Sequence, residues 1–137
     1  THMDSHHHIH MMTDIFPIYV QLAKEFQLAV RFHPRKWSNT QIREFKPLLD
    51  GLSYADQFLN SFYLNTITPD FFANLQLAEH TTYEMMCHPA YLDQWILSNS
   101  SYNIHRSIEA ETLQSEQTKQ YLTHRSIELI TFEQLHN

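Results

Sequence analysis

The chain begins with Thr1-His2-Met3-Asp4-Ser5-His6-His7-His8-Ile9-His10-Met11-Met12, and this stretch contains five of the eleven histidines. A purification tag would be an unbroken run of His, whereas Ser5 and Ile9 interrupt this run, and only Thr1-His2-Met3 is typical of a cloning remnant. The stretch therefore predicts a metal or catalytic site. The alternative is the polar end of a strand with solvated imidazoles.

The local conformation of this stretch determines which imidazoles lie together. On a strand, alternate side chains share one face. That face would carry Asp4, His6, His8 and His10. On a helix, His6 and His10 would share a face at the spacing of helical zinc-ligand pairs. Both conformations bring imidazoles together, so the metal hypothesis holds for either.

The rest of the chain predicts alternating strands and helices. If the His stretch is a strand, a helix over 14–27 and a strand over 28–32 complete one strand–helix–strand unit. A second such unit is predicted from a strand over 57–63, a helix opened by Thr68-Pro69-Asp70 and a strand over 83–88. Two helices over 104–113 and 116–123 and a last strand over 127–131 follow.

This alternation predicts an α/β fold in which parallel strands alternate with covering helices, as a single domain over residues 1–137. In such folds ligands bind at the carboxyl ends of the strands. These ends carry the His stretch, Arg31-Phe32-His33-Pro34 and Cys87-His88-Pro89. We therefore expect Arg31 and His88 at the same edge of the sheet as the His stretch.

Composition excludes several classes of function. The net charge of −6 argues against a nucleic-acid-binding surface, and no apolar run is long enough for a membrane span. The single glycine, Gly51, excludes Gly-rich phosphate loops. One cysteine and no signal peptide indicate a reducing compartment, so we expect the cytoplasm. The chain starts without Met inside its densest functional stretch, which leads us to expect the C-terminal part of a longer protein.

Several single residues are candidates for chemistry. His88 could act as a general acid, or it could be a structural residue that caps a loop. Cys87 next to it would point to the opposite face of a strand, so we expect a small buried hydrophobe rather than a nucleophile. Arg31 could bind an anionic or polar substrate group or brace Asp4, and the alternative is a surface ion pair.

Three aromatic residues after His88 could stack on a sugar ring. They are Tyr91, Trp95 and Tyr102. Aromatic side chains at such spacing are also common in cores, so both interpretations stay open.

Two motifs together resemble one known family. Asp4-Ser5-His6-His7-His8-Ile9-His10, joined with Met86-Cys87-His88-Pro89-Ala90-Tyr91-Leu92-Asp93, resembles the YdjC-like carbohydrate deacetylases, which include the chitooligosaccharide deacetylases. Further agreement follows in order along nearly the whole chain. It covers the predicted helix over 14–26, Ala29-Val30-Arg31, Ser100-Ser101-Tyr102-Asn103, Arg106, Glu111, Leu113, Ile127-Glu128-Leu129-Ile130 and Phe132.

The resemblance implies a fold and a reaction. The fold would be the C-terminal part of a (β/α) barrel-like deacetylase, and the reaction would be hydrolysis of a linear amide that removes acetyl groups from N-acetylated sugars. His6 would be a ligand of a divalent metal, Mg²⁺ or Zn²⁺. His88 would protonate the departing amine. Residues that line or brace the site or bind substrate would be Asp4, His8, His10, Arg31 and Tyr91.

The chain also departs from the family pattern. The family's Asp-Asp-Phe-Gly stretch and a second metal-binding His, which belong to its N-terminal half, have no counterpart here. We therefore expect this chain to be inactive alone, and its open sheet edges predict a homo-oligomer or a swapped assembly. Alternatives are a non-catalytic metal-binding or interaction module that retains the His-rich strand, or another kind of hydrolase that uses His88.

Overall fold

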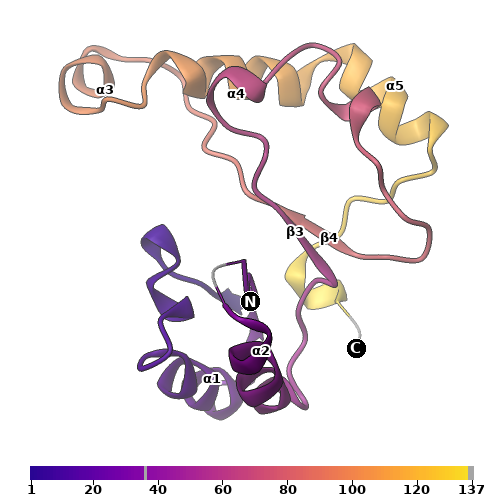
Figure 1. Ribbon diagram of the computed structural model, residues 1–137. Coiled ribbons are helices and arrows are strands. Elements are labelled where there is room, and N and C mark those ends of the chain that lie inside the picture. Colours follow the sequence, from indigo (N-terminus) through magenta and orange to yellow (C-terminus); the bar gives the residue numbers. More distant parts are fainter. Residues whose placement is uncertain (36, 136–137) are drawn as a thin grey trace. The chain divides into compact units, whose positions relative to one another are not determined.

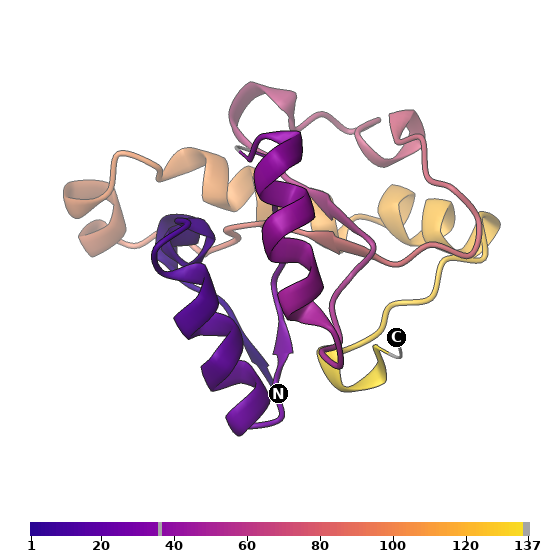
Figure 2. The same ribbon diagram turned by 60° about the horizontal axis from the view of Figure 1, so that its bottom comes forward.

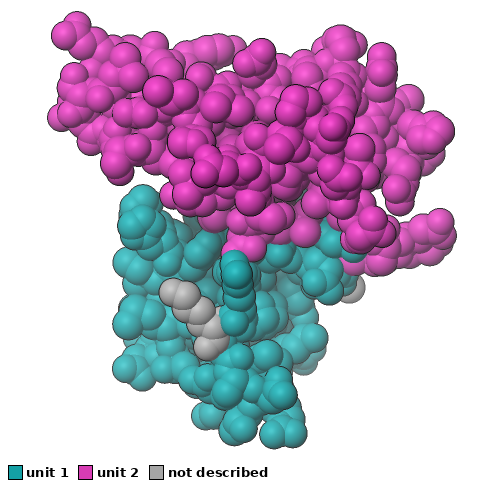
Figure 3. All heavy atoms as spheres, turned by 45° about the horizontal axis from the view of Figure 1, so that its top comes forward, with its two compact units in different colours: residues 1–58, 82–84, 130–137 teal, residues 59–81, 85–129 magenta. Residues whose placement is uncertain are grey.

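The structure is a computed structural model that describes residues 1–35 and 37–135. These residues cluster into two compact units, coloured teal and magenta in Figure 3. Unit 1 comprises Thr1–Phe58, Thr82–Glu84 and Ile130–Asn137, and unit 2 comprises Leu59–Thr81 and Met85–Leu129. The single domain over residues 1–137 stays a prediction.

The helices of unit 1 are few and short. They are α1 (Phe16–Glu25) and α2 (Asn39–Phe45), with the 3₁₀ turns η1 (His6–Met11), η2 (Lys46–Leu49) and η5 (Phe132–Gln134). Unit 2 holds α3 (Gln94–Asn99), α4 (Ile104–Gln114), α5 (Glu116–His124) and the 3₁₀ turns η3 (Leu64–Thr66) and η4 (Phe72–Asn74) (Figure 1).

The strands form two short parallel pairs. β1 (His2–Met3) pairs with β2 (Ala29–Val30), so that His2 lies opposite Ala29. β3 (Gln57–Leu59) pairs with β4 (Tyr83–Met85). The Gln57 N–H donates to the Thr82 carbonyl and the Met86 N–H to the Leu59 carbonyl, so the bonding advances in the same direction along both strands. The predicted α/β class with parallel strands is therefore confirmed.

The core of unit 1 forms around α1. Its buried residues recur at helical spacing, namely Phe16, Tyr19, Val20 and Ala23, and Pro17 occupies the first turn, where a missing N–H is tolerated. Figure 2 shows α1, in indigo, alongside the strands β1 and β2. Residues that complete this core are Val30, Phe32, Leu49 and Leu52.

The core of unit 2 is aromatic. It consists of Phe62, Ile67, Phe71 and Phe72, and the partly buried residues Leu75, Met85, Leu113 and Tyr121 pack against it. This core attaches the chain before β4 to the helices α4 and α5, and thereby positions the loop that follows β4.

Several predicted elements are confirmed, with ends that differ from the predicted ones by up to four residues. They are α1, β2, β3, β4, α4 and α5. The break between α4 and α5 falls at Ser115, whose side chain accepts the Thr118 N–H at 3.1 Å and begins the next helix.

Three predicted elements are wrong. The His stretch is a strand only at His2–Met3 and then forms η1, because the Ser5 hydroxyl accepts the His10 N–H at 2.9 Å and closes a turn. The helix opened by Thr68 is reduced to η4, since Phe71 and Phe72 pack into the aromatic core on successive positions. Residues 127–131 form no strand in the described chain, and Leu129 there is 78% exposed.

Among residues 1–35 and 37–135, no helix has the length and apolar character needed to cross a membrane.

Candidate functional site

The His stretch does not present its imidazoles on one face. His7 and His8 have φ angles of 54° and 56°, a left-handed conformation that is uncommon outside glycine. This turn leaves His6 exposed and stacked on His7, with ring centroids 4.0 Å apart. His8 is half-buried and His10 is buried. The predicted shared face of Asp4, His6, His8 and His10 is therefore wrong.

His10 is part of the packing of unit 1. Its Nδ1 lies 2.7 Å from the Ser5 Oγ, and its ring stacks on Tyr19 at 4.5 Å. Burial lowers the pKa of His10 to about 4, and the neighbouring His8 acts in the same direction. At neutral pH the imidazole is therefore neutral, and it fixes the turn that carries His6.

His8 lies among rings from other segments of unit 1. It makes edge contacts with His33 at 5.1 Å and with Phe58 at 5.4 Å. His33 in turn packs on Phe58 at 4.4 Å. The expected strand-end motif around His33 thus lies beside the His stretch.

Arg31 links two carboxylates. One guanidinium nitrogen lies 2.7 Å from Asp4 Oδ2, and Nε donates to Glu84 Oε1 at 2.5 Å. The guanidinium also lies over the Phe58 ring, 5.3 Å from its centroid. Burial raises the pKa of Glu84, and the hydrogen bond from Arg31 opposes this shift. Of the three interpretations considered for Arg31, these contacts fit the brace for Asp4.

Tyr19, from the core of unit 1, contacts the backbone of both segments that carry Asp4 and Arg31. Its hydroxyl donates to the Met3 carbonyl at 2.5 Å and lies 3.2 Å from the Arg31 carbonyl. β1 and β2 are thereby tied together where Asp4 and Arg31 leave the strands. The positions of these two side chains follow from the pairing of two strands of two residues each.

The described residues do not form a complete metal centre. Among residues 1–35 and 37–135, no three His, Cys, Asp or Glu side chains are grouped so that they could hold a metal ion. His6 is exposed and could supply one imidazole. A structural or catalytic metal in proteins takes at least three protein ligands in most sites, so the donor set within this chain does not fit one by itself.

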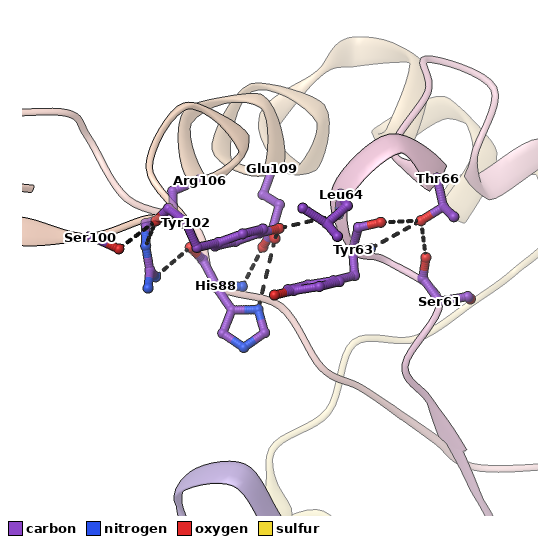
Figure 4. Close-up of polar contacts among 9 residues, drawn as sticks. All are labelled: Ser61, Tyr63, Leu64, Thr66, His88, Ser100, Tyr102, Arg106 and Glu109. Carbon is purple, nitrogen blue, oxygen red and sulfur yellow. Dashed lines mark hydrogen bonds and ion pairs between the residues drawn. The ribbon is translucent and has the colours of Figure 1, made fainter. Parts of the chain in front are cut away.

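His88 lies in unit 2, in the loop that follows β4 (Figure 4). Its side chain is 33% exposed, and its Nδ1 lies 3.8 Å from Oε1 of Glu109, a carboxylate on α4 with no exposed surface. The other oxygen of Glu109 accepts the backbone N–H of His88. The ring also has edge contacts with Tyr63 at 5.7 Å and Tyr102 at 5.6 Å.

Tyr102 and Arg106 fix the surroundings of His88. The Tyr102 hydroxyl donates to Glu109 Oε1, and burial together with this hydrogen bond raises the pKa of Tyr102. Arg106 donates to the carbonyl of His88 at 3.1 Å and to that of Tyr102 at 2.7 Å. A partly exposed imidazole held against a buried carboxylate can carry and deliver a proton.

The residues after β4 differ from expectation in one respect. β4 ends at Met85, so Cys87 is not in a strand, and it is exposed rather than buried. The buried small hydrophobe expected at Cys87 is therefore wrong. Tyr91 and Trp95 are 80% and 70% exposed, which excludes a core role for both.

The predicted site residues divide between the units. Unit 1 contains Asp4, His6, His8, His10 and Arg31, and unit 2 contains His88 and Tyr91. Their roles, and their location at one edge of a sheet, stay predictions.

Sequence reasoning did not find Glu84, Glu109 or Tyr63. A signal for Glu109 was present, because Arg106, Glu109, Ala110 and Leu113 share one helical face that is otherwise directed inward. An acidic residue on such a face needs a buried partner.

The chain is similar in sequence to proteins that are named as deacetylases. The chain is 35% identical to a carbohydrate deacetylase from Brevibacillus brevis and 36% identical to one from Clostridium beijerinckii, covering 98% of this chain and 53% of each relative. A chitooligosaccharide deacetylase from Yersinia pestis is 32% identical, over 96% of this chain and 51% of the relative. The chain thus spans about half the length of the curated relatives it matches.

A solved structure agrees with the fold. The crystal structure of an Enterococcus faecalis V583 protein, whose proposed role is cellobiose-phosphate cleavage, superimposes with a TM-score of 0.83 and 28% identity. The match covers 96% of this chain and 51% of that chain. Residues 1–124 match the sequence profile described as YdjC-like protein, and the chain therefore belongs to the YdjC-like protein family.

Proposed function

We propose that the protein carrying this chain is a carbohydrate deacetylase, a hydrolase that removes acetyl groups from N-acetylated sugars of the chitooligosaccharide type. The observation that carries the proposal is the match of nearly the whole chain to relatives named carbohydrate or chitooligosaccharide deacetylase. Both motifs, around His6 and around His88, lie within the residues that match the family.

The reaction divides into an addition and an elimination. Water adds to the linear amide carbonyl and loses a proton, and the carbon–nitrogen bond then breaks to give acetate and a free amine. The departing nitrogen keeps the electron pair of that bond and needs a proton. His88 is the proposed donor, because its imidazole is partly exposed and its Nδ1 side faces Glu109.

Around this reaction, we propose roles for the other candidate residues. Arg31 keeps Asp4 in place through their 2.7 Å ion pair, and His8 and His10 support the turn that carries His6. Tyr91 is exposed and would contact a sugar ring.

A divalent metal, Mg²⁺ or Zn²⁺, is part of the proposal. His6 would be one ligand, and the remaining ligands would come from residues outside this sequence, since the described residues do not group three donors. Such an ion would polarise the amide carbonyl and lower the pKa of the attacking water.

The metal proposal is tested by binding rather than by activity. Metal content after dialysis against Zn²⁺ or Mg²⁺ should fall when His6 is replaced in His6→Ala, in the complete protein. The matched control is His7→Ala, an exposed imidazole at the next position. Equal metal content in wild type and His6→Ala would remove His6 from the ligand set.

The wider architecture is also proposed. The parallel pairs β1–β2 and β3–β4 would be segments of a (β/α) barrel-like sheet, and their open edges would favour self-association of the chain when it is made alone. The single cysteine, Cys87, fits a reducing compartment, and we propose the cytoplasm.

Acetate release tests the function. The complete protein should release acetate from N-acetylglucosamine oligomers, His88→Ala should lower the rate by about 100-fold or more, and the 137-residue chain alone should be inactive. Cys87→Ser should retain the wild-type rate. Metal binding without acetate release from the complete protein would favour a non-catalytic module instead.

A further inference from the structure

We infer that Glu109 is a positioning residue for His88: its buried carboxylate faces Nδ1, so that the proton on Nε2 is the one presented to the substrate. This inference rests on the proposed function, in which His88 protonates the departing amine. It concerns a residue that no sequence motif singled out.

Glu109 contacts both the backbone and the side chain of His88. One carboxylate oxygen accepts the His88 N–H, and the other lies 3.8 Å from Nδ1. Figure 4 shows the second ring nitrogen of His88 on the side turned away from Glu109. The distance to Nδ1 is an ion-pair distance rather than a hydrogen bond, and such contacts commonly shorten when substrate binds.

The Glu109 carboxylate is buried beside the His88 ring. Glu109 has no exposed surface, and an ionised carboxylate in that environment is costly without a positive partner. From the same helix, Arg106 directs Nε and one terminal nitrogen to the carbonyls of Tyr102 and His88. When the His88 ring is protonated, its imidazolium forms an ion pair with Glu109 across the 3.8 Å to Nδ1.

Two aromatic rings also contact His88. Tyr63, which precedes η3, and Tyr102, which precedes α4, contact the imidazole by their edges. The Tyr102 hydroxyl donates to the same oxygen of Glu109 that faces Nδ1 and so holds the carboxylate in place.

The proton transfer follows from this arrangement. As the carbon–nitrogen bond breaks, the Nε2–H bond of the imidazolium breaks and its proton goes to the leaving nitrogen. His88 is then neutral and keeps its other proton on Nδ1, directed at Glu109. Glu109 neither gives nor takes a proton in this step, and solvent returns a proton to Nε2.

The first test is spectroscopic and uses the unaltered protein. In ¹⁵N NMR of the histidine side chains, neutral His88 should be the Nδ1–H tautomer, assigned with His88→Gln. The Nε2–H tautomer would overturn the inference. This readout is independent of turnover. The Nδ1–H tautomer without acetate release would refute only the proposed function. Acetate release with the Nε2–H tautomer would refute only this inference.

The second test is kinetic. Glu109→Gln, with the same shape but no charge, should lower kcat by roughly 10- to 100-fold with little change in KM. The high-pH limb of its rate profile should move to lower pH, because loss of a nearby negative charge disfavours the imidazolium. Glu109→Asp should keep that limb near its wild-type position.

Glu111 gives the matched control for the kinetic test. It lies two positions along α4 and is exposed, so Glu111→Gln removes the same charge from the surface of that helix and should leave kcat and the pH profile unchanged. An unchanged pH profile in folded Glu109→Gln would contradict the inference. If Glu109→Gln does not fold, the tautomer of the unaltered protein decides.

Discussion

Arg31 shows how one residue connects segments that are distant in the sequence. It pairs with Asp4, which follows β1, and with Glu84 in β4, and the side chains of Arg31 and Glu84 are 16% and 10% exposed. A brace between Arg31 and Asp4 was among the sequence predictions, since the His stretch and the predicted strand over 28–32 were expected to end at the same edge of the sheet. It could not indicate Glu84, because that contact spans 53 positions.

Replacing Arg31 should therefore lower the stability of the folded protein. Arg31→Met leaves two carboxylates facing each other, one of them largely buried, and should lower the free energy of unfolding by about 2–3 kcal/mol. Urea denaturation at neutral pH measures this. Adding Glu84→Gln should recover part of the loss, whereas Arg35→Met, at an exposed arginine, should have little effect. Strictly additive effects of Arg31→Met and Glu84→Gln would rule out the linkage.

His10 should make stability depend on pH. Burial lowers its pKa in the folded protein to about 4, whereas the ordinary value is 6.5. Between these values the unfolded chain binds a proton that the folded chain does not, so the free energy of unfolding falls as the pH falls through this window. The loss from this residue should be about 2–3 kcal/mol.

Denaturation curves at several pH values check the role of His10. His10→Gln should flatten the slope between about pH 6.5 and 4, and His124→Gln, at an exposed histidine on α5, should leave the slope as it is. An unchanged slope in His10→Gln would show that other groups cause the pH dependence.

At the scale of elements, prediction succeeded where local signals are strong. α1 has a buried stripe and an early proline, and Ser115 separates α4 from α5 by capping the second helix. α2 and α3 were missed because they have seven and six residues, too few for a clear period. The strands have two or three residues each, so alternation overestimated their length.

The short helix α2 depends on its cap. The Ser38 hydroxyl accepts the Gln41 N–H at 3.2 Å, and the Gln41 side chain accepts the Ser38 N–H at 2.8 Å. Ser38→Ala should lower the free energy of unfolding by about 1 kcal/mol, as loss of an N-cap does elsewhere. Chemical denaturation measures this, and Ser38→Asp, which restores an acceptor, should recover most of the loss. Equal stability of Ser38→Ala and wild type would mean that the cap contributes nothing.

At the scale of the whole molecule, the family could be predicted from the sequence, whereas a complete functional site could not. The motifs around His6 and His88 identified the family that the comparisons then showed. The chain covers about half of its relatives, 53% of the Brevibacillus brevis protein. The proposed metal would need ligands from other segments as well, so this chain predicts a single ligand, His6.

The proposed open sheet edges can be tested by measuring the mass of the chain in solution. The 137-residue chain made alone should self-associate, because unpaired strand edges template pairing with a second copy. Light scattering coupled to size-exclusion chromatography measures its mass, and a monomer at all concentrations would contradict the expectation. The complete protein should self-associate less than the chain alone.

The most direct test of the deacetylase account is the stoichiometry of its products. The complete, metal-loaded protein is incubated with N-acetylglucosamine oligomers, and acetate and new primary amines are counted in the same sample. The account predicts that each acetate released is matched by one free amine on an otherwise intact oligomer. No acetate, or sugar cleavage without new amines, would contradict it.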